Sequence, residues 1–138
     1  MSHRCTLATL LLALVSTVTM ARAETCAEVV VENVRPQRGH LMVAAYASAQ
    51  DFGKTALTQQ RLPAGEARMS FKLCNLSGGE VALTLFQDLD SDGKMARNLL
   101  GVPGEPWGAS GTPGTFGPSW DSTRVALDGK PIVVKLSQ

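Results

Sequence analysis

The chain has 138 residues, with 13 basic and 12 acidic side chains, a net charge of +1 and a hydrophobic fraction of 44%. This length accommodates a single domain with a core of its own. The near-neutral charge, without basic clusters, argues against a nucleic-acid partner and against electrostatic attraction to an anionic membrane surface.

The first 23 residues have the three parts of a secretory signal peptide. Arg4 supplies the positive start, an apolar stretch runs from Leu7 to Met20, and Ala21-Arg22-Ala23 is a small-residue cleavage site. The apolar stretch is too short to span a membrane. We therefore expect a chain processed to residues 24–138, without a membrane span and located in the periplasm or secreted. The leader carries two of the 13 basic residues and no acid, so the remaining chain has a net charge of −1.

Removal of this leader takes away Cys5 and leaves Cys26 and Cys74. An even pair of cysteines in an exported chain is typical of a disulfide, and only one pairing is available. The alternative, a reactive thiol, lacks a basic neighbour that would stabilise a thiolate. We predict a disulfide between Cys26 and Cys74.

Apolar and polar residues alternate with a period of two along most of the remaining chain, which is typical of strands. A short helix or an irregular connection is expected over residues 54–62. Asp128-Gly129 predicts a type I′ hairpin turn between the last two strands. The predicted strands are 27–34, 40–47, 66–73, 80–87, 123–127 and 132–136.

Strands with one polar face must bury the other face against a second sheet. The pattern therefore predicts an all-β, single-domain antiparallel β-sandwich over residues 24–138, immunoglobulin-like or prealbumin-like. It would have six to seven strands and one long Gly/Pro-rich loop. An immunoglobulin domain proper is not favoured, because no tryptophan lies between the two cysteines.

Residues 86–120 contain most of the glycine and proline, together with both tryptophans. We expect residues 88–118 to form one long loop that is the functional surface. Its aromatic side chains suit two roles, stacking on a sugar ring or peptide, or anchoring the loop to the sandwich. Anchoring is favoured for Trp120, which we expect to enter a strand, whereas both roles stay open for Trp107.

The start of this loop matches part of a calcium-binding loop. Asp88, Asp90 and Asp92 occupy positions 1, 3 and 5 of that template, Gly93 occupies position 6, and the Lys94 carbonyl would serve position 7. Three alternating carboxylates direct oxygens to one point, and an all-oxygen, flexible site favours Ca²⁺ over Mg²⁺.

Two template positions disagree, because positions 9 and 12 are Ala96 and Leu99 and the bidentate glutamate is therefore missing. Further ligands would have to come from Asn98, Glu105, backbone carbonyls or water. The alternative is an Asp-rich turn held by hydrogen bonds between side chains and backbone, without an ion.

Signals of catalysis are few. His40 is the only histidine outside the leader, and no Gly-x-Ser-x-Gly motif is present. A carboxylate pair for glycoside hydrolysis would have to come from Asp88–Asp92 and Glu105. These clustered acids lack the apolar pocket that a general acid needs. We assign no catalytic residue.

The segment Phe86–Ser110 resembles the hallmark segment of domain of unknown function 2141, a family of small exported bacterial proteins. Weaker resemblance extends over Val29–Leu136. The resemblance implies an exported β-sandwich and no known reaction. The matching positions are Asp88, Asp90, Asp92, Gly93, Lys94, Leu100, Gly101, Pro103, Glu105, Trp107, Gly108 and Ser110.

The expected function is an exported, non-catalytic binding or accessory module of the bacterial cell envelope. Calcium would order the loop, which would present Trp107 and Glu105 to an envelope protein or glycan. Two alternatives remain open. One is a hydrolase that acts on envelope polymers through the loop carboxylates, and the other is a purely structural envelope protein.

Overall fold

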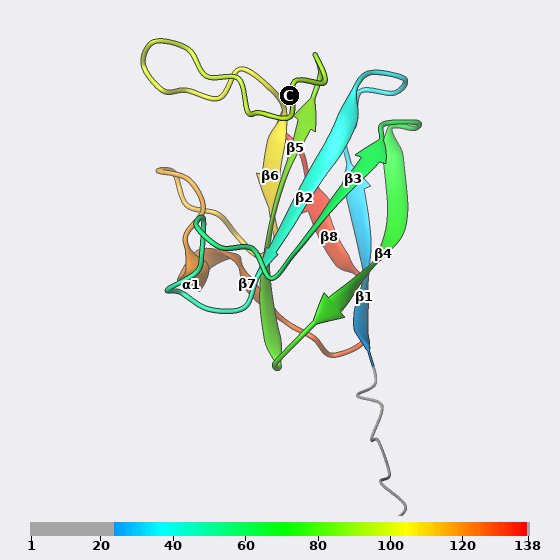
Figure 1. The fold of residues 1–138 in the computed structure, drawn as a ribbon, viewed down its shortest axis with the longest axis vertical. Helices are drawn as coiled ribbons and strands as arrows, with labels where there is room; N and C mark the ends of the chain where they lie inside the picture. The colour runs from blue at the N-terminus through cyan, green and yellow to red at the C-terminus, as the bar shows by residue number, and fades with distance from the viewer. Residues whose placement is uncertain (1–23, 138) are drawn as a thin grey trace, which may run out of the picture.

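The computed structural model describes residues 24–137, so the predicted leader lies outside the described residues. Two stacked sheets form a β-sandwich (Figure 1), which confirms the predicted fold class. One sheet has the order β4-β1-β8 and the other β3-β2-β5-β6, with β7 also paired to β5. The elements are β1 (Thr25–Glu32), β2 (His40–Tyr46), β3 (Thr58–Pro63), β4 (Arg68–Leu76), β5 (Glu80–Asp88), β6 (Trp107–Ala109), α1 (Trp120–Thr123), β7 (Arg124–Ala126) and β8 (Ile132–Lys135).

The core lies between the sheets and follows the alternation in the sequence. Every second residue of a strand points to the same face, so the apolar positions of each strand meet those of the opposite sheet. The predicted 40–47 strand is β2, which lies between β3 and β5 and is therefore a central strand of its sheet. The fully buried core side chains include Val29, Val31, Leu41, Leu73, Val81, Leu83 and Val134.

The expectation for residues 54–62 was wrong, because β3 occupies much of this segment. This strand has no clear signal in the sequence, because Gln59, Gln60 and Arg61 are all polar and do not alternate with apolar residues. β3 pairs only with β2, in antiparallel register, and therefore forms an edge of the sheet. An edge strand is held by backbone hydrogen bonds on one side and needs few apolar side chains.

The hairpin expected at Asp128-Gly129 is also absent from the described structure. β7 pairs with β5 in one sheet, whereas β8 pairs with β1 in the other. The chain therefore crosses between the sheets at this turn, and β8 runs parallel to β1. This crossing places Ile132 and Val134 in the core beside β1, and it makes the sandwich not purely antiparallel.

β6 divides the expected single loop into two, which we call the first loop (residues 89–106) and the second loop (residues 110–119). Both loops project from the same side of the molecule, in yellow-green and orange in Figure 1. On the outer edge of β6, the Trp107 carbonyl accepts a hydrogen bond from the Ser137 N–H at 2.7 Å. A Cβ at Gly108 would lie 2.6 Å from the Lys135 carbonyl oxygen, so glycine is required where β6 approaches the end of β8.

Trp120 does not enter a strand as expected. It begins α1, a single turn capped by Ser119, and it is half-buried. The strand predicted over 123–127 is the shorter β7. Within residues 24–137, no helix has the length and apolar character that crossing a membrane requires.

Candidate functional site

The acidic turn after β5 is closed by hydrogen bonds to its own backbone. The Asp88 side chain is fully buried and accepts the N–H of Asp92 at 3.1 Å and that of Gly93 at 2.8 Å. The Asp90 carboxylate also accepts the Asp92 N–H, at 3.2 Å. Ser91 has a φ of 61°, a left-handed conformation that lets the chain wrap around the Asp88 carboxylate.

Glu105 lies near the C-terminus of the first loop and holds that part of the loop against this turn. Its two carboxylate oxygens accept the N–H of Leu89 at 2.8 Å and that of Ala96 at 3.0 Å. Glu105 is only 6% exposed. As a result, Asp88, Asp90 and Glu105 each have a carboxylate oxygen within 4.8 Å of the other two. Three carboxylates that converge in this way form a candidate site for a hard cation.

The electrostatics of this cluster differ between the two aspartates. Burial acts to raise the pKa of Asp88, but the N–H of Gly93, the Asp90 carboxyl and further backbone N–H groups together hold that pKa below its ordinary value. For Asp90, the Asp92 N–H lowers the pKa, yet desolvation, the Asp88 carboxylate and the charges of Asp92 and Glu105 raise it overall. Desolvation, the contact with the Asp88 carboxyl and the like charges thus act together to raise the pKa of Asp90, the most exposed of the three.

The other predicted ligands take part in the local backbone structure. The Asp92 carboxylate accepts the Lys94 N–H at 2.8 Å and is not one of the three converging groups. Asn98 lies at the projecting tip of the first loop, where its side-chain oxygen accepts the N–H groups of Leu100 at 2.9 Å and Val102 at 3.0 Å. Asn98 therefore shapes the loop end.

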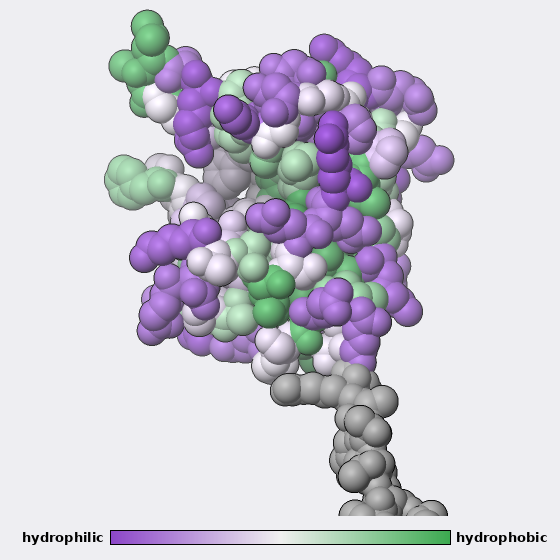
Figure 2. Space-filling model, viewed as in Figure 1, coloured by the Kyte–Doolittle hydropathy of each residue, from purple (hydrophilic) through white to green (hydrophobic). Residues whose placement is uncertain are grey.

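A groove of about 840 Å³ lies on the outer face of the second sheet, between the two loops. In Figure 2 it lies in the hollow between the two projections. Phe86 of β5 is directly paired with Trp107 of β6, so both side chains point to this outer face. The lining includes Tyr46, Phe52, Thr84, Phe86 and Trp107 from the sheet side, Met95, Arg97, Leu100, Val102 and Pro103 from the first loop, and Thr115, Phe116 and Pro118 from the second.

Trp107 and Glu105, the two predicted contact residues, lie in different places. Trp107 lines the groove and is half-buried, whereas Glu105 belongs to the acidic cluster and does not line the groove. Phe52 packs against Tyr46 with ring centroids 5.1 Å apart and ring planes tilted by 57°, which extends the aromatic lining of the groove. The groove and the acidic cluster are thus separate sites that share the first loop.

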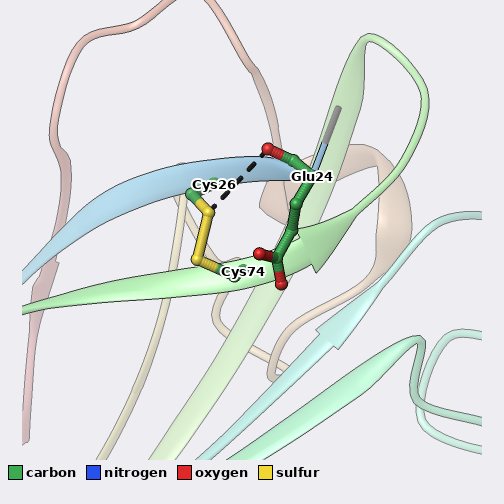
Figure 3. Close-up of side chains that lie close together, drawn as sticks. All are labelled: Glu24, Cys26 and Cys74. Carbon is green, nitrogen blue, oxygen red and sulfur yellow. Dashed lines mark hydrogen bonds between the residues drawn. A yellow bond between two sulfur atoms is a disulfide. The ribbon is translucent and has the colours of Figure 1, made fainter. Parts of the chain in front are cut away.

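Cys26 of β1 and Cys74 of β4 form the predicted disulfide (Figure 3). The Cys26 sulfur lies 4.0 Å from the Glu24 carbonyl oxygen. Glu24 and both sulfurs are close enough to resemble a metal-binding group. Because both sulfurs are committed to the disulfide, neither is available as a thiolate ligand.

Sequence reasoning missed two buried polar residues that support the site. The Gln87 amide donates to the carbonyls of Arg35 and Arg38, both at 2.7 Å, and its oxygen accepts the Arg35 N–H at 2.8 Å. The Ser110 hydroxyl donates to the Thr123 carbonyl and accepts the Leu83 N–H. One signal was available, because the alternation of Val81, Leu83 and Leu85 places position 87 on the buried face of the strand.

Residues 29–135 match the model of a family described as an uncharacterized protein conserved in bacteria, domain of unknown function 2141. This chain belongs to that family. No curated protein and no solved structure matches the chain. In this member of the family, the hallmark positions Asp88 and Glu105 bind backbone N–H groups, Gly108 allows β6 to approach β8, and Ser110 bridges two segments. The hallmark segment therefore builds the first loop and the strand β6 that separates the two loops.

Proposed function

We propose that this protein is an exported, non-catalytic binding module of the bacterial cell envelope, periplasmic or secreted. The observation that carries the proposal is the open, aromatic-lined groove between the two loops. Concave sites with apolar walls and a few polar groups are typical of ligand binding. The predicted signal peptide and the disulfide are consistent with export, since disulfides persist in oxidising compartments.

An envelope glycan is the ligand that we favour, ahead of an envelope protein. The paired rings of Phe86 and Trp107 offer flat apolar surfaces against which a sugar ring can pack. Thr84, Thr115 and the Arg97 guanidinium lie around the same groove and supply hydrogen-bonding groups. A groove that combines flat apolar rings with hydrogen-bonding groups suits a chain of sugar rings better than it suits a wholly apolar ligand.

Replacement of Trp107 by alanine is expected to lower the affinity for such a glycan about ten-fold, because the stacking surface is lost. Isothermal titration calorimetry with soluble envelope-glycan fragments measures this affinity. Trp120→Ala is the matched control, since Trp120 is the other tryptophan and does not line the groove. Equal binding by the Trp107 variant, or no binding by the unaltered protein, would contradict the proposal.

The hydrolase alternative is weaker because the acids do not face the groove. Asp88, Asp90 and Glu105 are absent from its lining, and both Glu105 oxygens already accept backbone N–H groups. A general acid needs an apolar environment that keeps its carboxyl protonated near neutral pH, whereas hydrogen bonds hold the pKa of Asp88 below its ordinary value. Hydrolysis of a glycan by the purified protein would favour the enzyme instead.

The proposal includes Ca²⁺ at the acidic cluster, where the ion would order the first loop. Asp88, Asp90 and Glu105 provide three converging carboxylates, and each oxygen can accept more than one partner. Ca²⁺ takes 6–8 oxygens, so backbone carbonyls and water would complete the set. A cation at this point would also offset the negative charges of Asp92 and Glu105, which are among the causes that raise the pKa of Asp90.

Millimolar Ca²⁺ is therefore expected to raise the thermal unfolding midpoint of residues 24–138 by several degrees relative to EDTA, since ligand binding stabilises the native state. Asp90→Ala should abolish this shift. Asp90 is the most suitable position because it is exposed and makes one backbone hydrogen bond, whereas Asp88 and Glu105 each make two. Asp128→Ala, at an exposed aspartate outside the cluster, is the control. An unchanged midpoint would leave the aspartates as a hydrogen-bonded turn.

A further inference from the structure

The projecting tips of the two loops, around residues 99–102 and 116, are called the loop ends below. They carry most of the large apolar side chains that the described residues expose. Six such side chains are exposed, and four belong to these loop ends. Leu99 and Phe116 are each 106% exposed, Leu100 is 87% exposed and Val102 is 53% exposed. Figure 2 shows apolar atoms at the ends of both projections on the same side of the molecule. Exposed apolar side chains gathered in this way mark an interaction surface.

Hydrogen bonds hold the end of the first loop in shape. The Asn98 N–H donates to the Val102 carbonyl at 3.0 Å, and the Gly101 N–H donates to the Asn98 carbonyl at 2.9 Å. The Arg97 guanidinium donates to the Gly101 carbonyl at 2.9 Å. Leu99 and Leu100 lie inside this closed turn, which holds both side chains exposed, and Leu100 also lines the groove.

The end of the second loop is a tighter turn. The Gly117 N–H donates to the Gly114 carbonyl at 3.0 Å, and these two glycines form an isolated bridge. Phe116 lies between them. The positive φ of Gly117, 104°, permits a turn this tight. Phe116 is therefore presented at a defined point, where it is exposed and also lines the groove.

The charges of the first loop are sorted along its length. The acids lie at its base, where Asp88 at the end of β5 and the loop residues Asp90, Asp92 and Glu105 accept backbone N–H groups. Residues 93–104, which form its outer part, contain Lys94 and Arg97 and no acid. Residues 110–119 contain no charged side chain. The projecting parts therefore carry positive charge, although the chain from residue 24 onward has a net charge of −1.

We propose that the two loop ends dock the protein on a lipid bilayer that contains anionic lipid, with Leu99, Leu100 and Phe116 inserted below the headgroups. Two convex, separate apolar ends fit a fluid bilayer, which accommodates each without a matching pocket, whereas a protein partner would need two pockets at the right spacing. Lys94 and Arg97 would then lie near the headgroup phosphates. The near-neutral charge of the whole chain does not oppose this docking, because apolar insertion supplies the main attraction.

Vesicle co-sedimentation of residues 24–138 tests the proposal. The core lies within residues 29–136, so this segment contains the complete sandwich and lacks the apolar leader, which would bind lipid by itself. We expect binding to phosphatidylglycerol/phosphatidylcholine vesicles that is tighter than binding to phosphatidylcholine alone. Leu99→Ser and Phe116→Ser should each lower the partition coefficient about ten-fold or more. The double variant should lower it by about the product of the two single fold-changes.

Val133→Ser is the matched control, because Val133 on β8 is 53% exposed, like Val102, but lies outside both loops. It should bind like the unaltered protein. All these side chains are exposed, so unfolding midpoints should not change. Absence of vesicle binding, or binding that Leu99→Ser leaves unaltered, would overturn the proposal. A dimer that forms without lipid and is lost in Leu99→Ser would also overturn it and assign the loop ends to a second copy. Leu99, unlike Leu100 and Phe116, does not line the groove, so the Leu99→Ser result is independent of the glycan measurement.

Discussion

Gly39→Ala is expected to lower the free energy of unfolding by about 2–5 kcal/mol, the sum of a left-handed backbone penalty and overpacking. Gly39 has a φ of 61°, and a Cβ at this position would overlap the carbonyl oxygen of Asp88. Neither β2 nor β5 can move away easily, because they pair along seven residues from His40–Asp88 to Tyr46–Ala82. The overlap would shift the backbone at the start of the first loop, so any response to Ca²⁺ should weaken as well. Urea denaturation measures the loss of stability.

Gly53→Ala separates the two causes of this effect. Gly53 has a similar φ of 72°, but nothing lies within 4 Å of a Cβ placed there. This variant should lose only the backbone penalty, about 1–2 kcal/mol. If both variants were equally stable, the close contact between Gly39 and Asp88 would contribute nothing, and the described packing of β2 against β5 would be wrong at this point.

Loss of the Cys26–Cys74 disulfide is expected to lower the free energy of unfolding by about 4 kcal/mol. The bond closes a loop with a sequence separation of 48, and it removes the corresponding conformational freedom from the unfolded chain. β1 and β4 already pair along most of their length, so the bond joins strands that are neighbours without it. The fold should therefore survive removal of the bond with lower stability. Denaturation of a Cys26→Ser/Cys74→Ser variant measures the effect.

A reducing agent provides the matching control. It should destabilise the unaltered protein by the same amount and leave the double serine variant unchanged. Sensitivity of the double variant to the reducing agent would show that something other than this bond responds to reduction. Equal stability of the oxidised protein and the double variant would contradict the entropic contribution assigned to the bond.

Much of the sandwich could be predicted because its strands have strong local signals. β2 and β5 alternate apolar and polar residues or are apolar throughout, and they lie within a residue of the predicted ranges 40–47 and 80–87. β3 and β6 could not be predicted in this way. β3 is polar and β6 has three residues, so pairing with a neighbour creates these strands. β8 had a clear pattern, but its parallel partner β1 is about a hundred residues away in the chain. Alternation of apolar and polar residues does not show whether two strands pair in parallel or antiparallel.

The acidic cluster was predictable in part. The Asp-x-Asp-x-Asp-Gly pattern indicated a tight turn with converging carboxylates, and Glu105 was among the further candidates. That Glu105 joins the turn while Asn98 shapes the loop end depends on how the first loop folds back, which spacing alone does not show. The groove was beyond prediction, because its walls come from β2, β5, β6 and both loops, and the loops are separated only by the unexpected β6.

The sequence by itself determined the strand faces of the core, the disulfide pairing and the acidic turn, because each rests on residues close together or on a single available choice. The tertiary structure alone decided which strands share a sheet, that the long loop is two loops, and that their apolar ends project from one side above a groove. The physical reason is that these features depend on hydrogen bonds and contacts between distant segments. Short polar strands and Gly/Pro-rich loops take their shape from what they pack against.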